Sequence, residues 1–260
     1  MKRKKIHLSV MPKEILSHLH SRGYKINDMG MSSALVYDYG DMILKVDYQS
    51  EETINEVRMC GWLAPFGLAP RILAEHLEKN IHFILMEKVQ GLELSDESYL
   101  KSPDLLIDSL ITALKHLWKT PIEGCPSYMT IENKLKLARK RVLNKEVDLS
   151  DWDEEIIRNR FKKPEELYDY LERHQHHEHL VVSHGDFCLP NIFFKDKNFE
   201  RFIDLGRAGL SSKWQDIALC VRSLKYNLGT DQYIPKFFAK LGIEPNHDLI
   251  DYYLLMDELF

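Results

Sequence analysis

The side chains best suited to catalysis lie in residues 183–191 and in a turn that follows them. Asp186 is followed five residues later by Asn191, and Asp204 comes after two further short apolar runs. In phosphoryl transfer, one carboxylate meets the attacking hydroxyl, while an amide oxygen and a second carboxylate hold Mg²⁺ against the phosphates. The three side chains have the types and the order that this chemistry needs, although Asp and Asn in turns often bond only the backbone.

The spacing of these residues favours the catalytic interpretation. Counted from His184, it matches the kinase catalytic-loop pattern H-x-D-x-x-x-x-N, and residues 204–206 stand where kinases have D-F-G. For one motif alone, a catalytic loop and a turn without function would be equally good interpretations. Two motifs in this order and spacing favour the catalytic one. We therefore predict that Asp186 is catalytic and that Asn191 and Asp204 are Mg²⁺ ligands.

A positive charge for a nucleotide is offered by Lys45, which interrupts the apolar run 42–46. Lysine is disfavoured in such a strand. Glu56, in the helix predicted next, could pair with it as the corresponding lysine and glutamate do in kinases. The alternative is a snorkelling lysine and a solvated glutamate. The loop 29–34, which contains Ser32, could lay N–H groups and hydroxyls over phosphates, but its single glycine makes this a weak signal.

The elements that would position these residues fall into two parts. Short β-like runs are expected at 35–39, 42–46, 71–74 and 82–86, with a helix at 51–63, and this order favours an antiparallel sheet carrying one helix. After Gly91 the apolar spacing is mainly helical. We predict an α+β, bilobal fold of the protein-kinase type: a small antiparallel N-lobe over 1–88 and a larger helical C-lobe over 89–260, with a hinge at about 87–91.

The composition bounds the class of protein. The chain has 260 residues, 44% hydrophobic and 29% charged, which suffices for a buried core. No apolar run approaches the ~18–20 residues of a membrane helix, and the basic start lacks the apolar stretch of a signal peptide. A net charge of -5 gives no general support to nucleic-acid binding. Four scattered cysteines indicate neither a zinc site nor disulfides and are expected to be buried. We expect a cytoplasmic protein without membrane or nucleic-acid partners.

Two acidic segments suggest a cationic substrate. Residues 146–155 contain six acids and no base, and the last twenty residues contain five acids without Lys or Arg. If both segments approach Asp186, they form an anionic cleft for a polyamine-bearing sugar, with an attraction that weakens with salt. The alternative is that 148–155 caps a helix and is solvated.

Taken together, the sequence resembles the aminoglycoside phosphotransferases, specifically the 3'-phosphotransferase (kanamycin kinase) branch, over essentially its whole length. The most specific parts are residues 182–191, 202–209, 215–218 and 255–260. The resemblance implies a kinase-like fold and transfer of the γ-phosphoryl group of ATP, with GTP possible, to the 3'-hydroxyl of an aminoglycoside, which confers resistance. It also implies Mg²⁺ as cofactor, an aminoglycoside as the small-molecule partner, and a monomer or weak dimer.

The resemblance also assigns roles to matching positions. Asp186 would orient and deprotonate the hydroxyl, and Asn191 and Asp204 would hold Mg²⁺. The nucleotide-binding residues that it implies are Lys45, Glu56, Ser32, and the backbone of Glu87 and Val89. The substrate-binding residues that it implies are Arg207, Asp153, Glu154, Glu258 and Phe260, the last through its carboxylate.

Some positions depart from the pattern. An aromatic residue that stacks on adenine in some relatives is matched by Ile43, which bears on nucleotide affinity and on the choice of ATP or GTP. Some relatives have an acidic substrate contact where this chain has Leu189, and an acidic pair where this chain has Tyr226-Asn227. These changes remove negative charge from the drug pocket and bear on the range of drugs rather than on phosphoryl transfer.

Alternatives remain for the function and for one histidine cluster. A kinase of the same fold could act on a choline-like or other antibiotic alcohol, although Arg207 and the acidic end at 258–260 favour an aminoglycoside. A catalytically silent nucleotide-binding protein is disfavoured because all four predicted kinase residues are intact. A protein kinase is disfavoured because no A-P-E stop follows Asp204. Residues 174–179 contain four histidines, for which adventitious metal binding is favoured over a physiological site.

Overall fold

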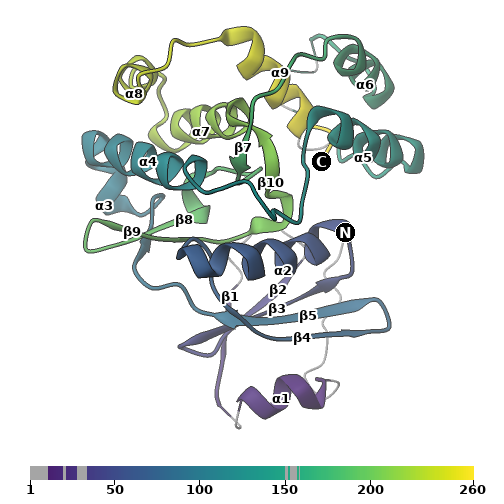
Figure 1. The fold of residues 1–260 in the computed structure, drawn as a ribbon, viewed down its shortest axis with the longest axis vertical. Helices are drawn as coiled ribbons and strands as arrows, with labels where there is room; N and C mark the ends of the chain where they lie inside the picture. The colour runs from purple at the N-terminus through teal and green to yellow at the C-terminus, as the bar shows by residue number, and fades with distance from the viewer. Residues whose placement is uncertain (1–10, 20–21, 28–33, 150–151, 153–156, 158) are drawn as a thin grey trace.

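The computed structural model describes residues 11–19, 22–27, 34–149, 152, 157 and 159–260. The N-terminal part, which contains a sheet, lies below the larger helical C-terminal part in Figure 1. The N-terminal sheet is antiparallel and has five strands in the order β1-β2-β3-β5-β4. These strands are β1 (Lys25–Asn27), β2 (Leu35–Asp38), β3 (Met42–Tyr48), β4 (Ile72–Glu78) and β5 (Ile81–Glu87). The α+β, kinase-like fold is as the sequence predicts, with β1 as an additional strand.

Strand β3 shows why the sheet presents Lys45 as it does. Residues Met42, Leu44 and Val46 are buried on one face, where they pack with helix α1 (Lys13–Leu19). Side chains alternate across a strand, so Lys45 lies on the opposite face. Gly40 makes the tight turn between β2 and β3 with a φ of 95°, a left-handed conformation that favours glycine.

Helix α2 (Glu51–Leu63), which has the predicted bounds, lies between the sheet and the C-terminal part in Figure 1. Ser50 and Thr53 form a reciprocal capping box at its start. The amide of Asn55 donates hydrogen bonds to the main-chain oxygens of Gly206, at 2.9 Å, and Ala208, at 2.8 Å. The helix is therefore fixed to the turn that follows Asp204.

The C-terminal part is mainly helical, as predicted. Its helices are α3 (Glu97–Leu100), α4 (Pro103–Trp118), α5 (Ile131–Asn144), α6 (Pro164–Arg173), α7 (Lys213–Leu228), α8 (Ile234–Leu241) and α9 (His247–Asp257). Its short strands are β6 (Leu92–Glu93), β7 (Leu180–Ser183), β8 (Ile192–Lys195), β9 (Asn198–Phe202) and β10 (Gly209–Ser212). Strands β6 and β10 do not follow from the sequence patterns. Strand β7 is buried only toward its end, because Leu180 is exposed.

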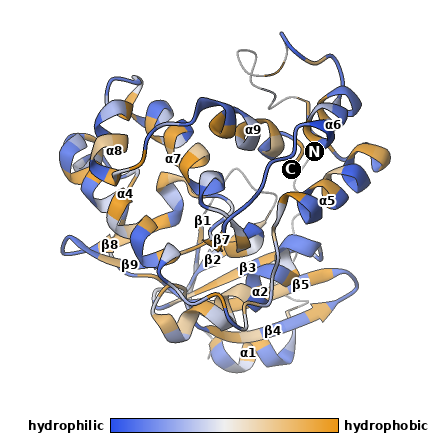
Figure 2. Ribbon diagram, turned by 45° about the horizontal axis from the view of Figure 1, so that its top comes forward, coloured by the Kyte–Doolittle hydropathy of each residue, from blue (hydrophilic) through white to orange (hydrophobic). Residues whose placement is uncertain are grey.

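The core of the C-terminal part positions the catalytic loop. Helix α7 packs against α4 and α9, and apolar residues appear in orange on all three helices in Figure 2. Phe187 and Phe202, from the loop and from β9, are fully buried in the same core and lie against each other, with ring centroids 5.9 Å apart. Among the described residues, none of the helices has the length and apolar character needed to cross a membrane.

We expect Asn55→Ala to lower the free energy of unfolding by about 1–3 kcal/mol, because two buried main-chain oxygens lose their donor. Urea unfolding of the purified protein measures this difference. Arg58→Ala, an exposed position on the same helix, is the matched control. Equal stability of the two variants would contradict the view that Asn55 joins α2 to the C-terminal part.

Candidate active site

The carboxylate of Asp186 is held by a donor at each oxygen. The Cys188 thiol donates to Oδ1 at 3.0 Å, and the Asn191 amide donates to Oδ2 at 3.0 Å. Burial and the neighbouring Asp186 raise the pKa of the Cys188 thiol, so that the thiol keeps its proton and remains a donor. The expectation that all four cysteines are buried is wrong for Cys188, which is half-buried and contacts the predicted catalytic residue, and holds for the other three.

Asp216, on α7, fixes the loop that carries Asp186. Its Oδ1 accepts hydrogen bonds from the Ser183 hydroxyl at 2.8 Å and from the main-chain N–H groups of His184 and Gly185 at 3.0 and 3.3 Å. Its Oδ2 accepts from the Trp118 indole at 3.0 Å. Burial raises the pKa of Asp216, and these hydrogen bonds oppose the rise. Sequence reasoning gave Asp216 no role, because its partners lie on three separate elements.

The catalytic loop and the turn after β9 are packed against each other. Gly185 has a φ of 80°, and a Cβ added there would lie 1.9 Å from the main-chain oxygen of Arg207. His184 contacts the main-chain oxygen of Ile203 through Nε2 at 3.0 Å. Only glycine fits between the two segments, and this close approach brings the predicted metal ligand Asp204 next to the catalytic loop.

Lys45 joins the N-terminal sheet to this turn. Its Nζ bonds both carboxylate oxygens of Glu56, at 2.9 and 3.1 Å, and Oδ1 of Asp204 at 2.7 Å. The predicted pairing of Lys45 with Glu56 is confirmed, whereas nucleotide binding by the pair stays a prediction. Asp204 itself has a φ of 55°, a strained conformation for a residue that is not glycine.

The pKa values of these groups follow from their burial and charges. Burial opposes the charge on Lys45, but Glu56 and Asp204 outweigh it and raise the pKa of the lysine. Burial raises the pKa of Glu56 although Lys45 opposes the rise. Lys45 lowers the pKa of Asp204 against the effect of burial. The lysine therefore stays charged, as a phosphate-binding group must.

Asn191 and Asp204 have a donor set that fits Mg²⁺. A main-chain hydrogen bond joins their segments, since the Ile203 N–H donates to the main-chain oxygen of Asn191 at 3.0 Å. The Asn191 side chain uses its N–H₂ group toward Asp186, which leaves its amide oxygen for a cation. An amide oxygen and a carboxylate suit Mg²⁺, which usually completes its coordination with water and substrate phosphates.

The predicted hinge residues lie at the end of β5. The Glu87 N–H donates to the Arg71 main-chain oxygen at 3.0 Å, so that only its carbonyl oxygen could face adenine. In the part of the chain that the structure describes, the main-chain N–H of Val89 has no hydrogen-bond partner. These two groups remain the predicted adenine contacts. Ser32 lies outside the described residues.

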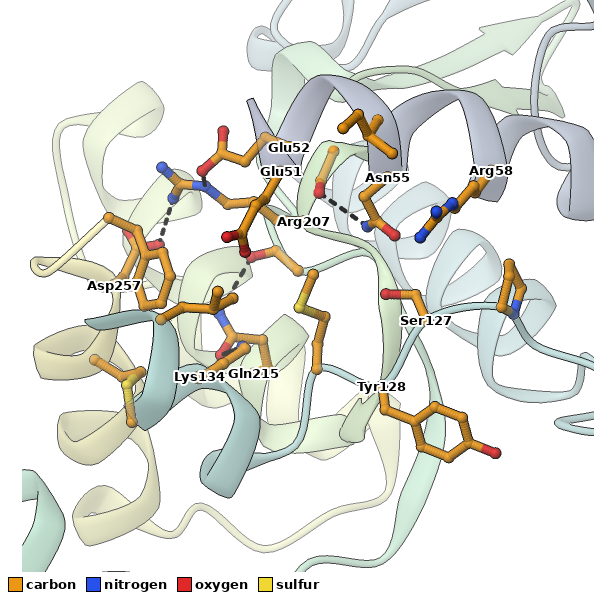
Figure 3. A pocket seen from close by; sticks show the side chains of 18 residues that line it. Glu51, Glu52, Asn55, Arg58, Ser127, Tyr128, Lys134, Arg207, Gln215 and Asp257 are labelled. Carbon is orange, nitrogen blue, oxygen red and sulfur yellow. Dashed lines mark hydrogen bonds and ion pairs between the residues drawn. The ribbon is translucent and has the colours of Figure 1, made fainter. Parts of the chain in front are cut away.

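On the predicted substrate side, arginines neutralise the acids. Arg207 bonds Glu52 at 3.2 Å and Asp257 at 3.0 Å, and Figure 3 shows it between these two carboxylates. Arg222 pairs with Asp257 and lies 3.4 Å from Glu258. Asp257 and Glu258 thus have arginine partners from other elements, which the local sequence does not show, and the anionic cleft stays a prediction.

The acidic segment 146–155 approaches the C-terminal residues at one described point. The Trp152 indole is buried and donates to the main-chain oxygen of Glu258 at 3.2 Å. The predicted substrate residues Asp153 and Glu154 lie outside the described residues. Phe260 and Arg207 lie together, with the Arg207 guanidinium carbon 5.8 Å from the centre of the Phe260 ring, while their binding of substrate stays a prediction.

A cavity of about 410 Å³ lies beside this site, between α2, α5 and α9. Arg207 and Phe260 form part of its wall. Lys134, which is only 6% exposed, also lines it and donates to the Gln215 side chain, which in turn donates to the Gly185 main-chain oxygen at 3.2 Å. The cavity thus adjoins the back of the catalytic loop.

The histidine cluster makes local contacts. Nδ1 of His174 lies 2.7 Å from the Tyr170 main-chain oxygen, and Nε2 of His176 lies 3.2 Å from the Tyr253 hydroxyl. Among the described residues, no group of three or more His, Cys, Asp or Glu side chains is arranged to hold a metal ion.

The fold and the site define a phosphotransferase of kinase-like architecture. A family model described as "Phosphotransferase enzyme family" matches residues 30–252. The chain is 36% identical to an aminoglycoside 3'-phosphotransferase of Enterococcus faecalis and 35% identical to one of Staphylococcus aureus; each match covers 89% of this chain and 91% of the relative. The chain therefore belongs to the phosphotransferase enzyme family and, within it, to the aminoglycoside 3'-phosphotransferases.

Solved structures support the fold. An aminoglycoside phosphotransferase APH(3'')-Id from Streptomyces rimosus superposes with a TM-score of 0.81 at 24% identity, over 95% of this chain and 96% of that one. The same protein is known in complex with ADP and streptomycin. An aminoglycoside-3'-phosphotransferase of type VIII gives a TM-score of 0.78 at 24% identity, over 94% and 97% of the two chains.

The buried Lys134 makes stability depend on pH. Burial lowers its pKa from 10.5 to about 8, against the opposing effect of Asp257 and other acids. Between these pH values the unfolded chain binds a proton that the folded chain has lost, so the free energy of unfolding rises with pH. Relative to Lys134→Met, the wild-type protein should gain about 3 kcal/mol from pH 8 to pH 10.5, at about 1.4 kcal/mol per pKa unit.

Urea unfolding at both pH values measures this gain. Lys136→Met, at an exposed position on the same helix, should leave the pH dependence of the wild type unchanged. A wild-type advantage over Lys134→Met that falls with pH would mean that the folded protein favours the charged lysine.

Proposed function

We propose that this protein transfers the γ-phosphoryl group of ATP to the 3'-hydroxyl of an aminoglycoside and so confers resistance to the drug. The observation that carries the proposal is the contact of Lys45 with Asp204 at 2.7 Å. It brings a cation from the N-terminal sheet to the turn packed against the loop of Asp186, which supports a site where phosphate binding and hydroxyl activation would meet. The names of the relatives at 35–36% identity support the choice of acceptor.

In this mechanism Asp186 accepts a hydrogen bond from the attacking hydroxyl and takes its proton as the phosphorus–oxygen bond forms. The donors from Cys188 and Asn191 hold the carboxylate in place before the substrate arrives. Lys45 would neutralise charge on the phosphates, with Glu56 fixing its position. Mg²⁺, held by Asn191 and Asp204, would supply further neutralisation of the phosphate oxygens when bound.

The acceptor would enter from the side of Arg207, Glu258 and Phe260. Asp153 and Glu154, which lie outside the described residues, are proposed as further contacts to it. Asp257 and Glu258 already pair with Arg207 and Arg222, so amino groups of the drug would have to replace an arginine to bind these carboxylates. Recognition would then exchange one cation for another and would gain little from long-range attraction alone. Phosphorylation would replace a hydroxyl by a dianion and so weaken binding of the drug to the ribosome. We also propose that the enzyme is cytoplasmic, where ATP and ribosomes are found, and a monomer or weak dimer.

The nucleotide would bind between the two parts of the chain. We propose that residues 87–91 form the hinge between lobes 1–88 and 89–260, with the Glu87 oxygen and the Val89 N–H facing the base. Ser32 would close over the phosphates. Ile43, on the same face of β3 as Lys45, would lie against the base in place of an aromatic residue. ATP is the expected donor, and GTP would be tested beside it.

Asp186→Ala should lower kcat by about 10²–10⁴-fold, the usual contribution of a general base. The Kd for Mg-ATP should change little, because Asp186 is not among the proposed phosphate-binding groups. Steady-state kinetics and nucleotide titration measure the two quantities. Asp169→Ala, at an exposed position on α6, is the control. Wild-type turnover by Asp186→Ala would end the assignment of the base.

A substrate panel tests the acceptor. With Mg-ATP and an ADP-release assay, we expect turnover of kanamycin and neomycin, and none of tobramycin, which lacks the 3'-hydroxyl. Choline should not be turned over. Turnover of choline, or of another small alcohol without turnover of kanamycin, would favour a kinase of the same fold with a different acceptor.

A further inference from the structure

Residues 258–260 are held by side chains from elsewhere through two main-chain oxygens and the carboxylate of Phe260. Arg141, a half-buried residue of α5, donates from Nε to the Leu259 main-chain oxygen at 2.8 Å and from Nη2 to one oxygen of the Phe260 carboxylate at 2.7 Å. Trp152 donates from its indole to the Glu258 oxygen at 3.2 Å. Three successive oxygens therefore each have a donor from outside the segment.

The aromatic ring of Phe260 is fixed as well. The guanidinium carbons of Arg141 and Arg207 each lie 5.8 Å from its centre. Arg207 is in turn bound to Glu52 and Asp257. A planar guanidinium donates two hydrogen bonds in fixed directions and stacks its face on a ring at the same time, whereas an ammonium group has neither the fixed fork nor a face to stack. Arg141 thus joins α5 to the segment that carries Glu258 and Phe260.

We propose that Arg141, supported by Trp152, is a positioning residue that sets the affinity for the aminoglycoside by holding residues 258–260 in their binding conformation. This inference rests on the proposed function, because Glu258 and Phe260 act on the drug only if they face it. Arg141 lies on the substrate side of the molecule, and none of its described contacts is with Lys45, Asp204 or the hinge. Its loss should therefore change drug binding and leave nucleotide binding unaltered.

The direction of the effect separates positioning from simple electrostatics. If Arg141 only neutralised the site, removing its charge would make the site more negative and would lower the KM for a polycationic drug. If Arg141 positions the segment, its removal frees residues 258–260 and raises the KM, because ordering them then costs binding free energy. The two roles predict opposite signs in one measurement.

The experiment compares Arg141→Met with Arg139→Met, an exposed arginine on the same helix. We expect Arg141→Met to raise the KM for kanamycin about tenfold, the effect of losing a charge-assisted hydrogen bond, with the KM for ATP and kcat within about twofold of wild type. Arg139→Met should match wild type. A KM for kanamycin that is unchanged or lower in Arg141→Met would overturn the proposal.

Two further variants test the geometry. Arg141→Lys keeps the charge but loses the planar fork that reaches both oxygens in fixed directions and stacks on the Phe260 ring, so it should raise the KM for kanamycin nearly as much as Arg141→Met; wild-type behaviour would contradict positioning by the guanidinium. Trp152→Phe keeps an aromatic side chain but removes the indole donor. It should raise the KM for kanamycin without changing the KM for ATP. Melting temperatures show that each variant is folded.

Failure of this inference can be told from failure of the proposed function. If wild-type protein shows no turnover of kanamycin or neomycin but binds Mg-ATP, the proposed acceptor is wrong. If wild-type turnover is present and Arg141→Met has wild-type kinetics, the proposed function stands and the positioning role of Arg141 is wrong.

Discussion

The buried carboxylate of Asp216 is the interaction on which the site depends. It gathers donors from the catalytic loop and from Trp118 of α4, and so ties Ser183, His184 and Gly185 to α7. Burying a carboxylate without hydrogen-bond donors is unfavourable in free energy, so Asp216 stabilises the conformation of the loop that supplies those donors. That conformation brings Gly185 against the turn after β9, and it determines where the neighbouring Asp186 lies. The catalytic carboxylate is thus placed by a residue that need not touch the substrate.

Helix α2 connects the two halves of the proposed site. Glu56 on this helix holds Lys45 on the nucleotide side, while Glu52, one turn earlier, holds Arg207 on the substrate side. Asn55 between them fixes the helix to the turn after Asp204. A shift of α2 would therefore change both sides together.

The sequence predicts the parts of the site that are local and leaves out those that are assembled from afar. The spacing of Asp186, Asn191 and Asp204, and the pattern that sets Lys45 on one face of a strand, are properties of short segments, and the bounds of α2 follow from local spacing in the same way. The donors to Asp216, and the arginines that pair with the C-terminal acids, come from elements far apart in the chain. Strands β6 and β10 are missed for the same reason, since their pairing is with distant segments.

The pairing of acids with arginines changes how recognition of a cationic drug is understood. The local sequence shows two segments of acids without basic neighbours, but Asp257 is shared by Arg207 and Arg222, and Glu258 lies against Arg222. An ammonium group that binds there replaces a guanidinium as partner, and the displaced arginine needs another acid or solvent. The net gain from charge is then small, because desolvation offsets much of it. In the proposed function, shape and the positions of residues 258–260 would supply the rest, and the hydrogen bonds from Arg141 to these residues would then bear on drug affinity more than the number of acids does.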